Sequence, residues 1–129
     1  MILSITAFIL TSTLPTECGD AWGCYGIKEK QIYINTITPM SERRYIYQHE
    51  LGHSTFFELK PYQRKIWESQ MSKNPYCSTE YGYSLPDGTE CFAEVYAEIT
   101  TTKENNKNKP KLDSFQWKFV KNLLTRRTK

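Results

Sequence analysis

The sequence is poor in histidine and has no long hydrophobic run. Only two histidines occur in 129 residues, and no stretch of about 20 apolar residues is available to form a transmembrane helix. None of the four cysteines forms a C-x-x-C pair, which argues against a cysteine-based zinc site. Internal repeats are also absent. We therefore expect residues 1–129 to form one domain, because this length suffices for a single hydrophobic core but not for two.

The charges are distributed unevenly along the chain. Residues 1–100 contain 8 Lys+Arg and 12 Asp+Glu, whereas residues 101–129 contain 9 and 2, so the net charges of the two parts are −4 and +7. A basic segment of this kind makes a module that binds nucleic acid or an anionic surface one hypothesis. Basic helix faces are more often simply solvated, so we do not expect nucleic acid to be a partner.

The four cysteines form two pairs that are close in sequence, Cys18 with Cys24 and Cys77 with Cys91. An even number of cysteines in a small chain is typical of disulfides formed in an oxidising compartment. We therefore predict these two disulfides and a secreted or extracytoplasmic protein.

The first third of the chain indicates two strands. Residues 1–15 are apolar, β-branched and aromatic up to Pro15, which favours a buried strand. A signal segment is the alternative, although no Lys or Arg precedes the apolar run and no small-x-small cleavage site follows it. Residues 30–35 alternate, with Ile32 and Ile34 on one side, which predicts a half-exposed strand at the edge of a sheet.

His49 and His53 both belong to the pattern H-E-x-x-H, on a predicted helix that begins after Pro39. A spacing of four residues places both imidazoles on one helix face, where their nitrogens can converge on one Zn²⁺. Glu50 then flanks the same face and is the candidate general base toward a zinc-bound water. Gly52 lies within this helix at a cost of about 1 kcal/mol relative to alanine, which indicates a close approach by another backbone.

A second helix is predicted from Pro61 and a third near Glu90, where Glu90, Glu94 and Glu98 recur every four residues. This acidic row is either a solvent-exposed helix face or a face that takes part in metal binding. In the functional interpretation, Glu90 is a metal ligand and Glu94 accepts a hydrogen bond that orients a ligand histidine.

The end of the chain is predicted to be a linker followed by a helix. Residues 103–110 are polar and have no packing residues, and residues 111–127 have an apolar stripe that includes Phe115, Phe119, Val120 and Leu123. We therefore expect an α+β fold. A small twisted sheet with an edge strand packs on the H-E-x-x-H helix and the Glu90 helix, and the C-terminal helix closes the domain.

The two motifs together resemble those of the gluzincin zinc metallopeptidases. The combination of H-E-L-G-H at 49–53 with E-C-F-A-E at 90–94 is most similar to the catalytic domain of anthrax lethal factor and the related Pro-Pro endopeptidases. The resemblance covers about residues 30–124. It implies that His49, His53 and Glu90 bind one Zn²⁺ and that Glu50 is the general base.

The same resemblance implies a catalytic tyrosine ahead of Glu90. The family's spacing of seven residues selects Tyr83, whereas the likeness of Ser78-Thr-Glu-Tyr81-Gly82 to the family's S-x-Y-[AG] context selects Tyr81. A tyrosine hydroxyl there would stabilise the oxyanion of the tetrahedral intermediate.

We therefore expect a monomeric zinc metalloendopeptidase that acts on a peptide or protein substrate. The basic binding module remains one alternative. A structural, non-catalytic zinc protein is the other, and it would normally require a fourth protein ligand.

Overall fold

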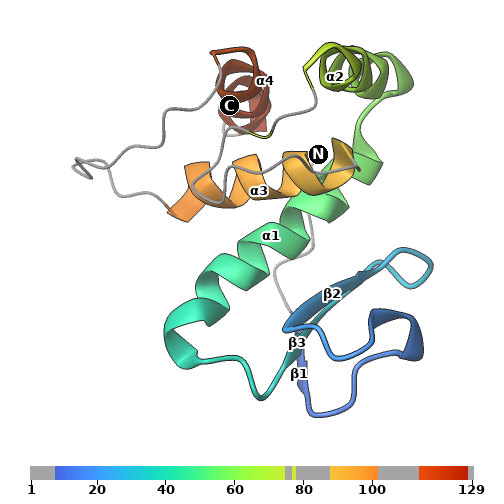
Figure 1. The fold of residues 1–129 in the computed structure, drawn as a ribbon, viewed down its shortest axis with the longest axis vertical. Coiled ribbons are helices and arrows are strands. Elements are labelled where there is room, and N and C mark those ends of the chain that lie inside the picture. The colour runs from blue at the N-terminus through green and yellow to red at the C-terminus, as the bar shows by residue number, and fades with distance from the viewer. Residues whose placement is uncertain (1–7, 75–76, 78–87, 102–113, 128–129) are drawn as a thin grey trace.

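The computed structural model describes residues 8–74, 77, 88–101 and 114–127. This part of the chain is an α+β fold, which confirms the predicted fold class (Figure 1). Its elements in order are β1 (Ile9–Thr11), a short 3-10 helix η1 (Thr16–Cys18), β2 (Gly23–Gly26), β3 (Gln31–Asn35), α1 (Met40–Glu58), α2 (Pro61–Lys73), α3 (Gly88–Thr101) and α4 (Ser114–Arg127). The sheet lies at one end of the molecule and α2 and α4 at the other, and α1 runs between them (Figure 1).

The sheet has the strand order β1-β3-β2, with β1 parallel and β2 antiparallel to β3. The strand predicted at residues 30–35 is therefore confirmed, with Ile32 and Ile34 fully buried on one side. Its predicted position at the sheet edge is wrong, because β1 and β2 pair with it on both sides. The edge strand beside α1 is β2, which the sequence did not predict. Gly23 and Gly26 bound this strand, and glycine weakens the sequence pattern of a strand.

Within residues 1–15, the described strand is β1 at Ile9–Thr11. The prediction of a strand is confirmed here, but the prediction that it is buried is wrong: Phe8, Ile9 and Leu10 are each more than 40% exposed. β1 is an edge strand that pairs only with β3 among the described residues, so one side of it is left open.

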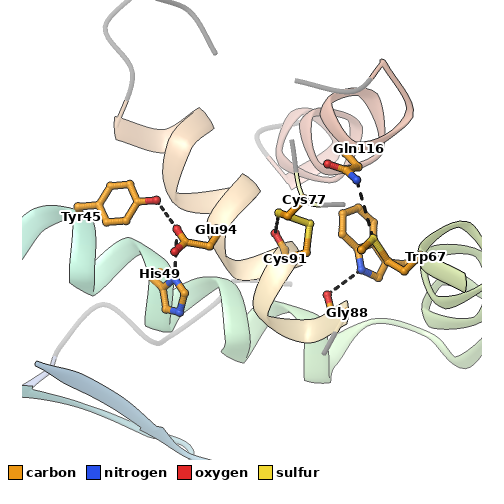
Figure 2. Close-up of a disulfide and its surroundings, with 9 residues drawn as sticks. Tyr45, His49, Trp67, Cys77, Gly88, Cys91, Glu94 and Gln116 are labelled. Carbon is orange, nitrogen blue, oxygen red and sulfur yellow. Dashed lines mark hydrogen bonds and ion pairs between the residues drawn. A yellow bond between two sulfur atoms is a disulfide. The ribbon is translucent and has the colours of Figure 1, made fainter. Parts of the chain in front are cut away.

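The main hydrophobic core lies between the helices. Phe92 of α3 is at its centre, with its ring 5.2 Å from the rings of both Phe56 and Trp67. Trp67 also donates a hydrogen bond from Nε1 to the carbonyl of Gly88 at 2.9 Å, which connects α2 to the start of α3 (Figure 2). From α4, Val120 is fully buried, and Phe115, Phe119 and Leu123 pack against the core. The predicted apolar stripe of the C-terminal helix is thus confirmed, whereas the linker at 103–110 lies outside the described residues.

Both predicted disulfides are present. Cys18 pairs with Cys24 at a Cα–Cα distance of 5.9 Å, and Cys77 pairs with Cys91 at 5.4 Å (Figure 2). The first connects η1 to β2, and the second connects Cys77 to the first turn of α3. Across the described part of the chain, no helix has the length and apolar character needed to span a membrane.

Candidate metal centre

The two histidines lie on one face of α1, as their spacing predicts. The helix is continuous from Met40 to Glu58, so His49 and His53 are separated by one turn. Their ring centroids are 4.9 Å apart and the planes meet at 77°. Each side chain is only about one-eighth exposed, which keeps most of the imidazole surface away from water.

Glu90 of α3 completes the cluster. Its Oε2 is 2.8 Å from Nε2 of His53, and its Oε1 is 3.4 Å from Nε2 of His49. One ligand atom from each of these three residues lies within 4.8 Å of the others. Around a tetrahedral zinc with bonds of about 2.1 Å, ligand atoms are roughly 3.4 Å apart. Two imidazoles and a carboxylate at these distances could hold a metal ion, and the predicted ligand set is brought together.

Gly52 allows α1 and α3 to approach each other closely. A Cβ atom placed on Gly52 would lie 2.9 Å from the Cα of Ala93 and 3.0 Å from the Cβ of Tyr96, which is closer than van der Waals contact allows. The predicted close approach by another backbone is therefore confirmed. Because His53 follows Gly52, this contact also sets the distance between the histidine face and Glu90.

The charges of the cluster depend on one another. Burial lowers the pKa of His49, but the carboxylates of Glu90 and Glu94 outweigh that effect and raise it to about 10. Contacts with His49 and His53 in turn hold the pKa of Glu90 well below its usual range. Without a metal, the centre is thus an ion pair of an imidazolium with a carboxylate. Two neutral imidazoles and an ionised Glu90 are the form that binds a cation.

Glu50 is buried between α1 and the sheet, with 7% of its surface exposed. Burial raises the pKa of its carboxyl group, and the nearby histidines act in the opposite direction. A Cβ on Gly23 of β2 would lie 3.3 Å from Oε2 of Glu50, so the strand backbone passes directly over this carboxylate. A partly desolvated carboxylate with a raised pKa beside these histidines is suited to proton transfer.

Glu94 lies next to His49, as predicted. Its Oε2 is 3.7 Å from Nδ1 of His49, and the same oxygen accepts a hydrogen bond from the hydroxyl of Tyr45 (Figure 2). The side chain of Glu94 is 14% exposed, and Glu98 one turn further on is 6% exposed. The interpretation of the acidic row as a solvated face is therefore wrong for these two residues.

A cavity of about 570 Å³ opens beside the cluster. Its polar wall includes His49, His53, Glu50, Glu90 and Glu94. Its apolar wall comes from β2, its flanking residues and the end of α1, namely Trp22, Tyr25, Ile27 and Phe57. The rings of Tyr25 and Phe57 stack at 6.3 Å. The carbonyl of Trp22 accepts hydrogen bonds from Asn35 N and Thr38 Oγ1, which holds the start of this wall against the sheet.

Sequence reasoning missed the contribution of β2 and of Tyr45 to this site. Tyr45 lies four residues before His49, so the spacing that identifies the second histidine also places this tyrosine on the same face. No comparable pattern marks Trp22 or Tyr25, because pairing with β3 brings them to the cavity. Tyr81 and Tyr83, the predicted catalytic tyrosines, lie outside the described residues.

No family model matches the chain, and neither the curated proteins nor the solved structures include a match.

Proposed function

We propose that the protein is a zinc-dependent endopeptidase. The observation that carries this proposal is the convergence of His49, His53 and Glu90 beside the buried carboxylate of Glu50, at the wall of an open cavity. Catalytic zinc sites use three protein ligands and leave a position for water, whereas structural sites normally close all four positions. Among the described residues the cluster has three members, and all four cysteines are paired in disulfides.

The reaction is hydrolysis of a peptide bond. His49, His53 and Glu90 would hold a Zn²⁺ ion, which would supply a coordinated water with a pKa of about 7 and would polarise the substrate carbonyl. Glu50 would accept the proton that this water loses as the water oxygen bonds to the carbonyl carbon. The carbon–nitrogen bond then breaks, and Glu50 delivers the proton to the leaving amine. Tyr83 or Tyr81 remains the predicted donor to the oxyanion.

The edge strand that can hold an extended substrate is β2. Its backbone pairs with β3 on one side, and the residues from Ala21 to Tyr25 line the cavity. An extended peptide is able to add to such an edge through main-chain hydrogen bonds, which bind any sequence. Residues 30–35, which were predicted to form the edge strand, do not offer such an edge because β3 is paired on both sides.

The cavity favours apolar side chains next to the scissile bond. Trp22, Ile27 and Phe57 are 42%, 57% and 39% exposed, so each has apolar surface for a ligand to cover. The opposite wall is acidic, and no Lys or Arg is among the described residues that line the cavity. A substrate carboxylate would be repelled there, whereas an aromatic or aliphatic side chain would bury surface worth about 25 cal/mol per Å².

The two disulfides support an extracytoplasmic location, since such bonds persist in oxidising compartments. We infer that the protein is secreted and that its substrate is a peptide or protein outside the cytosol.

The test combines elemental analysis with cleavage of a peptide library by the full chain. We expect one zinc per chain and cleavage beside large apolar residues. Glu50→Gln should retain the zinc and lose turnover, because Glu50 acts on the water and not on the ion. Glu68→Gln, on the exposed face of α2, is the matched control and should behave as wild type. Zinc binding without any cleavage would support a structural role instead, and nucleic-acid binding without zinc would support the basic binding module.

A further inference from the structure

Two rows of side chains face each other across the contact between α1 and α3. Tyr45, His49 and His53 follow one another at intervals of four residues on α1, and Glu90 and Glu94 do so on α3. The rows run in opposite directions. Glu90 contacts both histidines through their Nε2 atoms, and Glu94 contacts His49 through Nδ1 and also contacts Tyr45.

We propose that Tyr45 is a positioning residue of the metal centre, acting through Glu94 on His49. The hydroxyl of Tyr45 donates to Oε2 of Glu94, and this is the oxygen that lies 3.7 Å from Nδ1 of His49 (Figure 2). The proposal rests on the metal site of the proposed function and not on its peptidase activity.

The reason lies in the two nitrogens of the imidazole. For Nε2 of His49 to bind a cation, the proton of the neutral ring must be on Nδ1, and an acceptor there stabilises that tautomer. Oε2 of Glu94, 3.7 Å from Nδ1, is the carboxylate oxygen placed to be that acceptor, but a glutamate side chain has several rotamers of similar energy. A hydroxyl that donates to Oε2 favours the rotamer in which this oxygen faces the ring. Tyr45 is on the same helix as His49, one turn away, so the distance between these two residues along α1 is fixed.

The chain has a matched control in Tyr47. This tyrosine is two residues away on α1 and is also partly buried, but its ring contacts Phe8 at 5.3 Å. Tyr45→Phe and Tyr47→Phe each remove one hydroxyl from the same helix and leave the ring in place. A general effect of losing a tyrosine hydroxyl would appear in both variants, and an effect through Glu94 only in the first.

The experiment measures zinc affinity by competition with a chelator in the full chain. Loss of an outer partner of a ligand histidine typically lowers metal affinity 10- to 100-fold. We expect a loss in this range for Tyr45→Phe and for Glu94→Gln, and wild-type affinity for Tyr47→Phe. The double variant Tyr45→Phe/Glu94→Gln should lose no more than Glu94→Gln alone, because the tyrosine acts through that carboxylate. Visible spectra of the cobalt-substituted proteins should change in the same variants and not in Tyr47→Phe.

Several outcomes would overturn the proposal. Equal zinc affinity in wild type and Tyr45→Phe would overturn it. If kcat also fell in that variant, the hydroxyl would act on the substrate and not on the metal centre. Additive losses in the double variant would exclude action through Glu94. A lower melting temperature of the metal-free Tyr45→Phe protein, matching its loss of affinity, would indicate a structural role. If the expected affinities are found but no peptide is cleaved, the peptidase function fails and the role of Tyr45 stands.

Discussion

Replacing Gly52 with alanine is expected to destabilise the protein, although the same change in an ordinary helix interior is stabilising. Alanine is favoured over glycine in helices by about 1 kcal/mol. At this position, however, the new Cβ would lie 2.9 Å from the Cα of Ala93 and 3.0 Å from the Cβ of Tyr96. Carbon atoms in favourable contact are about 3.5–4.0 Å apart, so α1 and α3 must separate by roughly 0.5–1 Å.

The size of the effect follows from these two opposing contributions. Overpacking a core typically costs about 1–3 kcal/mol, and the Ala93 contact lies toward the upper end because a backbone atom cannot rotate away. After subtracting the helix gain, the net loss is about 1–2 kcal/mol. For a chain of this length that corresponds to a fall in Tm of roughly 4–8 °C. Zinc affinity should fall as well, because His53 adjoins Gly52 and Glu90 is on the opposite helix.

The assay is thermal unfolding of the metal-free protein followed by circular dichroism, together with a zinc titration. Ser69 on the exposed face of α2 gives the matched control. Ser69→Ala should be more stable than Ser69→Gly by about 1 kcal/mol, which measures the helix preference without overpacking. If Gly52→Ala raises Tm as the control pair predicts, or leaves zinc affinity unchanged, the close approach of α1 and α3 does not set the geometry of the centre.

Three further predictions concern the metal, the cavity and a disulfide. The pKa of His49 is raised from 6.5 to about 10, so its stabilising contribution to the metal-free protein is complete below pH 6.5 and is lost as the pH rises through about 10. Near neutral pH, zinc must therefore displace about one proton from this residue when it binds. Calorimetry in buffers of different ionisation enthalpy should give binding heats that depend on the buffer, and heats that do not depend on it would contradict the prediction. Phe57→Ala should lower kcat/KM about tenfold for peptides with an aromatic residue beside the scissile bond. Ile66→Ala, at a similarly exposed site on α2 that does not line the cavity, should leave kcat/KM unchanged. Reduction of the Cys77–Cys91 disulfide by a phosphine should weaken zinc binding, because Cys91 adjoins the ligand Glu90; unchanged affinity would show that α3 is held without it.

The features that sequence reasoning predicted are those governed by local spacing. His49 and His53 lie on one face because a helix repeats every 3.6 residues, and Glu90 and Glu94 share a face for the same reason. The cysteine pairs are close in sequence, and their Cα–Cα distances are typical of disulfides.

The features that it missed depend on contacts between distant segments. The strand at residues 31–35 was recognised from its alternation, but its central position depends on the pairing of β1 and β2, which no local pattern encodes. Tyr25 is brought to the cavity by that pairing, and its ring then stacks on Phe57 of a different element. Glu98 is buried rather than solvated because α3 packs among the other helices.

The disulfide at the start of α3 makes the metal centre depend on whether Cys77 and Cys91 have been oxidised. Cys91 is fully buried and follows Glu90 directly, so the bond to Cys77 restrains the turn of helix that presents one of the three ligands. In the chain-entropy model, a loop of about 15 residues closed in this way disfavours the unfolded state by about 3 kcal/mol. A newly made chain in a reducing compartment lacks that restraint and holds its ligands less firmly. Under the proposed function, this disulfide would therefore have to form before the centre holds a metal ion firmly.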